Sequence, residues 1–152
     1  MTVLHILFKV GTAEYVVPSA LVAEIESFTT ATRVPGAPAH VLGLVQIRGR
    51  VLPVVDLRVR FGLDAVERGL AARVIVVRDG ERQVGLLADE AREVVRLEAA
   101  AFRPPPPVVS EQSAGFVDAI AVAGDRMVMR IDIPRVVGVD VVPQEARDGT
   151  QA

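Results

Sequence analysis

The chain has 152 residues and a net charge of −2, and it contains no cysteine. A chain of this length buries about 68–70% of its unfolded surface, so it can form its own core. The missing cysteines exclude disulfides and thiolate metal sites, and the slightly acidic balance argues against a nucleic-acid-binding module, which carries a concentrated basic face. We find no run of about 20 apolar residues that would cross a membrane, and the N-terminus lacks the segments of a signal peptide.

The first part of the chain alternates short apolar runs with turn residues, as antiparallel strands do. Gly11 and Thr12 predict a tight turn between two strands, and Pro18 can open a short helical turn. Residues 23–28 alternate like a strand, although a helix over 19–27 is an alternative that periodicity does not settle. The elements expected here are strands over 4–10, 14–17 and 23–28, helical turns over 20–22 and 39–42, and a loop over 29–38.

The most informative stretch covers residues 43–63, GLVQIRGRVLPVVDLRVRFGL. Two apolar runs flank Arg48-Gly49-Arg50, and Gly49 can adopt a positive φ at no steric cost, which predicts a hairpin. Arginine cannot be deprotonated and carries a planar fork of donors, so this corner suits recognition better than proton transfer. A solvated turn is the alternative. Pro53 cannot donate to a ladder, which predicts an edge or bulged strand, and an exposed edge could accept another protein's strand.

The second half continues the pattern of hairpins. Asp79-Gly80 and Gly124-Asp125 predict two of them. Four prolines at 104–107 predict an extended segment, and residues 134–137 predict a short helix that Gly138 would end. The expected strands are 73–78, 83–88, 91–97, 116–122 and 126–131, with a polar loop over 64–72 and a frayed tail from 143. About nine or ten short strands with little helix predict a mainly β fold, either small barrels or a sandwich.

Constellations for catalysis are sparse. His5 and His40 are the only histidines, and neither lies in a metal-ligand spacing. Asp56, Asp89 and Asp132 each end or interrupt an apolar run; they could pair as a general acid and base, but such residues more often cap turns. We find no phosphate-binding loop and no nucleophile elbow. The sequence therefore predicts no enzyme activity and no cofactor or metal.

The chain resembles the CheW family, the adaptors of bacterial chemosensory arrays. The resemblance runs from about residue 7 to residue 137, and its most specific part is the run over 43–63. The other segments that carry it are 15–18, 22–25, 34–38, 84–89, 102–104, 124–127 and 131–133.

This resemblance implies one CheW-like domain over 1–152, made of two packed five-stranded, SH3-like β-barrels with short helices. The approximate lobes would be 14–66 and 73–132, intertwined at the termini, with a flexible tail over 143–152. The implied function is non-catalytic: the adaptor couples the cytoplasmic tip of a chemoreceptor to the regulatory domain of the histidine kinase CheA. Such a protein is cytoplasmic and is recruited to membrane receptor arrays, with no nucleic acid partner and no membrane insertion.

The resemblance also implies a set of partner-binding residues: Val22, Glu24, Arg48, Gly49, Ala91 and Val94. Arg48 matches a family arginine needed for array function, and Ala91 and Val94 match positions that face a receptor groove between the lobes. Gln46, Ala91 and Ala119 replace the usual asparagine, valine and glycine. These departures leave two alternatives open, a paralogue for a non-flagellar pathway and a competitor domain that binds only one partner.

Overall fold

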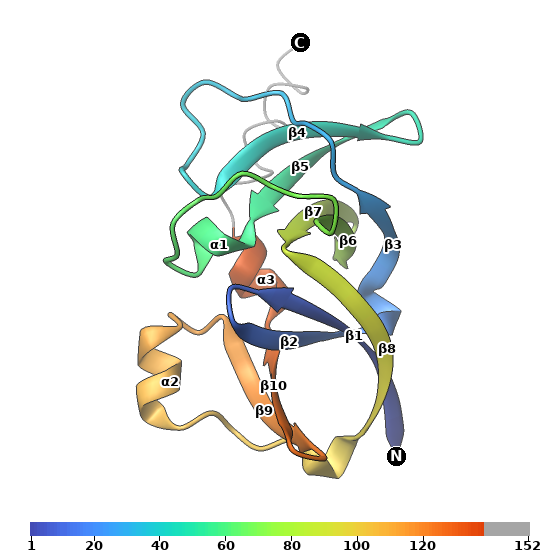
Figure 1. Cartoon of the computed structure of the whole chain (residues 1–152), viewed down its shortest axis with the longest axis vertical. Coiled ribbons are helices and arrows are strands. Elements are labelled where there is room, and N and C mark those ends of the chain that lie inside the picture. The colour runs from blue at the N-terminus through green and yellow to red at the C-terminus, as the bar shows by residue number, and fades with distance from the viewer. Residues whose placement is uncertain (139–152) are drawn as a thin grey trace.

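The computed structural model describes residues 1–138. Within them, ten strands form two five-stranded sheets, which occupy the lower and upper halves of Figure 1. Sheet 1 has the strand order β8-β1-β2-β10-β9, and sheet 2 has the order β3-β6-β7-β5-β4. The predicted mainly β fold with short helices is confirmed. The predicted tail over 143–152 lies outside the described residues.

The strands are β1 (Thr2–Val10), β2 (Ala13–Pro18), β3 (Val22–Ser27), β4 (Val41–Ile47), β5 (Arg50–Asp56), β6 (Arg73–Asp79), β7 (Arg82–Ala88), β8 (Glu90–Glu98), β9 (Val117–Ala123) and β10 (Arg126–Ile131). The short helices are η1 (Ser19–Leu21), α1 (Leu57–Arg60), η2 (Ala99–Ala101), α2 (Pro107–Gln112) and α3 (Ile133–Val137). Residues 22–27 form a strand, so the alternative of a helix over 19–27 is wrong.

The boundaries of the two sheets along the chain differ from those of the predicted lobes over 14–66 and 73–132. Sheet 2 takes the consecutive strands β3 to β7, whereas sheet 1 combines β1 and β2 with β8, β9 and β10. β8 follows β7 directly and runs from the upper half of the molecule into the lower half (Figure 1). The N-terminal hairpin belongs with the late strands because β2 pairs in parallel with β10 and β1 pairs with β8.

Each sheet curls until its two edges come close. In sheet 1, Arg103, which follows β8, forms a bridge with Ile120 on β9. In sheet 2, Thr32, which follows β3, forms a bridge with Leu44 on β4. The ladders themselves stay open, since none joins β8 to β9 or β3 to β4 among the described strands. The predicted barrels are therefore curled sheets held together at single bridges.

Three hydrophobic cores explain why several strands are apolar on both faces. Side chains alternate along a strand, so on β6 Val74 faces a core inside sheet 2 while Ile75 faces a core between the sheets. On β1, Leu7 faces a core inside sheet 1 and Phe8 faces the core between the sheets. We call these the sheet 1 core, the sheet 2 core and the inter-sheet core. Strands at the junction bury both faces, which requires continuous apolar runs.

The prediction that the strand carrying Pro53 is an edge is wrong. β5 lies between β7 and β4, and the bulge in its pairing with β4 lies between Val41 and Gly43. Its parallel pairing with β7 begins at Val54, one residue after the proline. Pro53 is tolerated because it sits in the half of β5 that pairs with β4 alone.

Two further local predictions are corrected. The helical turn expected over 39–42 is a β-turn, in which Val41 N–H donates to Pro38 O at 3.0 Å, and β4 starts at Val41. The proline run is extended only as far as Pro106, because Pro107 opens α2. Proline fits the first helical position because an N–H group there would have no partner within the helix, so its absence costs no hydrogen bond.

Candidate protein-binding site

The β4–β5 turn consists of two residues with positive φ. Ile47 pairs with Arg50, so Arg48 and Gly49 form a two-residue loop with φ values of 52° and 79°. Positive φ at both positions is the mark of a type I′ turn, whose twist matches that of the strands. Gly49 adopts this conformation freely, as predicted, whereas Arg48 adopts it as a non-glycine residue. The Arg48 side chain projects outward and is 72% exposed.

Glu24 binds both arginines of this turn. Its carboxylate accepts from Arg48 Nε at 2.7 Å and from Arg50 Nη2 at 2.6 Å. Arg50 also donates to Gln83 Oε1, and Glu26 Oε2 lies 3.6 Å from Arg48 Nη2. The hydrogen bond from Arg48 lowers the pKa of Glu24, and the same bond raises the pKa of Arg48. We call Glu24, Glu26, Arg48 and Arg50 the charged corner.

The charged corner spans the concave side of sheet 2. Glu24 on edge strand β3 lies opposite Val76, whose side chain is in the sheet 2 core. Arg48 and Arg50 reach Glu24 from the β4–β5 turn, which lies toward the opposite edge of the sheet from β3. The structure therefore brings together three of the predicted site residues, Glu24, Arg48 and Gly49.

Val22, Ala91 and Val94 lie instead at the junction of the two sheets. Val22 on β3 and Ala91 on β8 both pack against the inter-sheet core. Val94 pairs with Ile6, a member of that core, so it lies on the same face of sheet 1. It is nevertheless 57% exposed.

A bulge in β8 puts Ala91 and Val94 on one face. Residues three apart on a regular strand point to opposite faces. Here Leu7 pairs with Glu93 while Phe8 pairs with Ala91, so β8 has one extra residue between them. The bulge reverses the alternation, and both side chains face the junction. No sequence pattern pointed to this extra residue.

Other exposed apolar side chains lie on the same two faces. Leu4 lies two residues before Ile6 on β1 and points to the same face of sheet 1. Ile25 pairs with Ile75 and points to the same face of sheet 2. Leu4 and Ile25 therefore lie on the two faces that enclose the inter-sheet core. They are 43% and 38% exposed. β6 contacts β8 and η1, and η1 contacts β1, so these elements adjoin. We call Leu4, Val22, Ile25, Ala91 and Val94 the seam patch.

The carboxylates considered as a general acid and base have structural partners. Asp56 caps α1 by accepting from Arg58 N–H at 3.0 Å, and Asp132 caps α3 by accepting from Arg135 N–H at 3.2 Å. Asp89 binds Arg58 and Arg68, and Arg68 also binds Asp56. The capping interpretation is therefore correct for Asp56 and Asp132. Arg68 was not among the predicted site residues, because it lies in a loop that the sequence predicts only to be polar.

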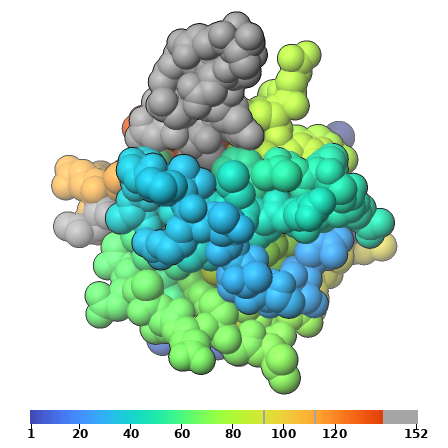
Figure 2. All heavy atoms as spheres, turned by 90° about the horizontal axis from the view of Figure 1, so that it is seen from above, coloured from blue at the N-terminus to red at the C-terminus, as the bar shows by residue number. Residues whose placement is uncertain are grey.

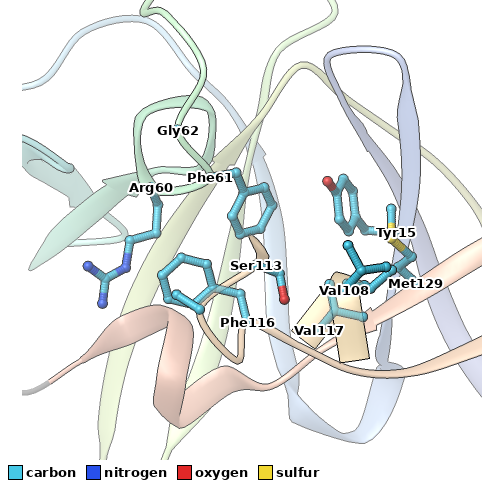
Figure 3. A pocket seen from close by; sticks show the side chains of 11 residues that line it. Tyr15, Arg60, Phe61, Gly62, Val108, Ser113, Phe116, Val117 and Met129 are labelled. Atoms are coloured by element: carbon cyan, nitrogen blue, oxygen red, sulfur yellow. The ribbon is translucent and has the colours of Figure 1, made fainter. Parts of the chain in front are cut away.

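A pocket of about 550 Å³ lies between α1, α2 and sheet 1. Tyr15, Phe61 and Phe116 form its aromatic wall, with ring centroids 5.0 and 5.7 Å apart, and Val108 and Met129 also line it, Met129 beside Tyr15 (Figure 3). The Arg60 guanidinium lies 4.9 Å from the Phe116 ring centroid and donates to Val136 O at 2.9 Å. The chain has only one tyrosine and five phenylalanines, so three of its six aromatic rings gather here. No sequence pattern predicted this pocket.

Within residues 1–138, no group of histidine and acidic side chains could hold a metal ion. No helix in the same part of the chain is long and apolar enough to span a bilayer. Besides the pocket, the described surface carries the charged corner and the seam patch. Two curled β sheets that present such surfaces define a protein-interaction module.

Comparisons with known proteins specify which module this is. A CheW-like domain matches residues 5–140. The chain is 34% identical to the chemotaxis protein CheW of Rhizobium meliloti over 143 residues, which cover 94% of this chain and 89% of the relative. It is 30% identical to the CheW of Klebsiella aerogenes over 130 residues, covering 86% and 78% of the two chains.

A solved structure agrees with the sequence relatives. The scaffolding protein TtCheW from Thermoanaerobacter tengcongensis superimposes with a TM-score of 0.85 at 28% identity, covering 92% of this chain and 95% of that one. The chain therefore belongs to the CheW family, a family of scaffold proteins, and it is a chemotaxis adaptor.

Proposed function

We propose that this adaptor couples the cytoplasmic tip of a chemoreceptor to the regulatory domain of the histidine kinase CheA, without catalysis of its own. The seam patch receives the apolar face of a receptor helix, and the charged corner takes part in array assembly. The protein works in the cytoplasm and is recruited to membrane receptor arrays, with no nucleic acid partner and no membrane insertion.

The exposed apolar seam is the observation that carries the proposal. An amphipathic helix buries a stripe of apolar side chains in a groove lined by others. The seam patch offers Val94 and Leu4 from sheet 1 and Val22 and Ile25 from sheet 2. Ala91 is smaller than the valine that the family resemblance implies at this position, and the smaller apolar area would weaken receptor binding by roughly 1–2 kcal/mol if the site is fully buried.

The direct test measures pairwise binding with purified protein, a receptor signalling fragment and CheA from the same organism. Val94→Asp puts a charge in the proposed contact and should weaken receptor binding at least tenfold while binding to CheA is retained. Val122→Asp is the matched control, because Val122 is 59% exposed on β9 and lies outside the seam patch. Equal receptor binding by wild type and Val94→Asp would contradict the proposed receptor site.

The same assay separates the alternatives. A protein that binds both partners and raises kinase activity in the mixture is the adaptor. Binding of wild type to only one partner identifies the competitor domain. If both partners bind, a deletion strain scored for swimming and for surface motility distinguishes a flagellar from a non-flagellar pathway. A fluorescent fusion should form foci that disperse when the receptors are deleted.

A further inference from the structure

Asp89 lies at the point where the chain passes from sheet 2 to sheet 1, between β7 and β8. Its carboxylate accepts from Arg58 Nη1 at 2.8 Å and also from Arg68 Nη1. On its other side, Gly11 N–H donates to the carboxylate at 2.7 Å, and the Asp89 N–H donates to Lys9 O at 2.9 Å. Asp89 therefore contacts α1 and the loop beside sheet 2, and also the β1–β2 turn of sheet 1.

Arg68 differs from the rest of its loop. Its neighbours over 64–71 are exposed, yet the Arg68 side chain is only 8% exposed and also binds Asp56, which is 5% exposed. Arg58 Nε donates to Asp64 O at 3.0 Å and fixes the start of the same loop. Figure 2 shows the loop in green along the outer side of the molecule, beside sheet 2. The loop is thus attached to the corner that joins the two sheets through ion pairs that are buried at Asp56 and partly buried at Asp89.

We infer that Arg58, Arg68 and Asp89 form a lock that fixes the angle between the sheets and thereby shapes the seam patch. Both arginines belong to the flank of sheet 2, whereas Gly11 belongs to sheet 1, and Asp89 binds all three. β8 begins one residue after Asp89, so the same contacts set where Ala91 and Val94 lie relative to β3. The three lock residues are positioning residues for the partner site.

Electrostatics favour the arrangement in which every charged group of the lock has its partner. Two aspartates share Arg68, and removing the arginine leaves two carboxylates close together with one fewer cation. A buried charge that loses its partner is strongly unfavourable, so the arrangement with all pairs formed is preferred over relaxed ones. Arginine holds two carboxylates at once through its planar fork, which a lysine point charge does not reproduce.

The absence of cysteine in the chain makes the inter-sheet angle directly measurable. Val51→Cys on β5 and Val122→Cys on β9, at side chains 54% and 59% exposed, accept spin labels on sheet 2 and sheet 1. Pulsed dipolar spectroscopy should give one narrow distance distribution for the labelled parent. Asp89→Asn, which keeps the side-chain shape but removes the charge, should broaden it at least twofold, and Arg68→Ala should do the same.

Arg73→Ala is the matched control. Arg73 donates to the carbonyl oxygens of Leu70 and Ala72 at 2.7 and 2.8 Å, so its loss also frees the loop but leaves Asp89 paired. Its distance distribution should match that of the labelled parent. Circular dichroism confirms folding, and Asp89→Asn carries the test if Arg68→Ala does not fold.

The link to the seam patch rests on the proposed function and is tested separately. Asp89→Asn should weaken binding of the receptor signalling fragment about tenfold. An unchanged distance distribution in Asp89→Asn overturns the lock, whatever the receptor binding. A broadened distribution with unchanged receptor binding overturns its effect on the partner site. If the unsubstituted protein fails to bind the receptor fragment, the proposed function is wrong, and the distance measurement still decides the lock.

Discussion

His5 is a buried ionisable side chain on β1, between the apolar residues Leu4 and Ile6. It is 1% exposed, its Nδ1–H donates to Val3 O at 3.1 Å, and its ring lies 5.2 Å from that of Phe102. Its Nε2 has no hydrogen-bond partner among residues 1–138. Burial lowers the pKa of His5, and the charge of Arg130 lowers it further, against the opposing effect of the Val3 hydrogen bond. The folded protein therefore favours the neutral ring.

This burial predicts a pH-dependent stability. The unfolded chain protonates His5 near its ordinary pKa of 6.5, whereas the folded chain takes up that proton only at lower pH. The unfolded state thus binds more protons, and the free energy of unfolding should fall as the pH drops through 6.5 toward the folded pKa. Denaturant titrations between pH 7.5 and pH 5 test this. His5→Leu should flatten the dependence, and an equal slope in both proteins would refute the assignment to His5.

Arg48 is exposed and sits on a turn that does not need its side chain. Arg48→Ala should therefore leave the circular dichroism spectrum and cooperative unfolding intact while weakening array assembly. Assembly is measured as kinase activation in a mixture with CheA and receptor fragments. Glu24→Gln is the companion variant, because it removes the carboxylate that holds Arg48 and Arg50. Unchanged coupling in Arg48→Ala would exclude a role for this side chain.

At the scale of single elements, the bulge of β4 depends on Gly43. Its φ is 151°, and a Cβ at this position would lie 2.3 Å from Thr32 O. That oxygen accepts from Leu44 N–H at 2.8 Å in the bridge that holds the two edges of sheet 2 together. The glycine is thus needed because the loop backbone passes directly over it.

Gly43→Ala should lower the free energy of unfolding by about 2–3 kcal/mol, since the added methyl group must displace backbone atoms. Denaturant unfolding measures the loss. Gly36→Ala is the control: it has a φ of 80° but nothing within 4 Å of the new Cβ, so it carries the conformational cost alone. Equal losses in the two variants would show that the close contact does not matter.

At the scale of the whole molecule, the inter-sheet core joins the two sheets into one unit. It takes side chains from both sheets and from α1 and α3, among them Phe8, Ile75 and Val136. α3, in the centre of Figure 1, contributes three buried residues to it. Because neither sheet covers this core alone, we expect the sheets to unfold together.

A matched pair of substitutions tests the cooperativity. Leu7→Ala opens a cavity in the sheet 1 core and Leu87→Ala in the sheet 2 core, where both side chains are 1% exposed. Each should cost about 2–5 kcal/mol. Tyr15, the only tyrosine, lies on β2 of sheet 1 and packs against the inter-sheet core, so its fluorescence reports on sheet 1 and on its contact with that core. Leu87→Ala should shift the tyrosine transition and the circular dichroism transition equally; a shift in circular dichroism alone would mean that the sheets unfold separately.

The sequence by itself determined the local structure. Alternation and turn residues located all ten described strands, the Asp79-Gly80 and Gly124-Asp125 hairpins and the helix before Gly138, because these depend on neighbours within a few residues. The run over 43–63 was specific enough to indicate the family. The α2 helix was missed because prolines mark an extended segment as readily as a helix start.

Only the tertiary structure decided how these elements combine. The parallel pairing of β2 with β10 assigned the N-terminal hairpin to the late strands, and pairings between distant segments leave no periodic trace in the sequence. The ion pair of Glu24 with Arg48, the bulge that aligns Ala91 with Val94, and the burial of Arg68 beside Asp89 arise in the same way. From the sequence alone, a charged residue in a loop is expected to be solvated, and only the fold determines whether a carboxylate lies against it.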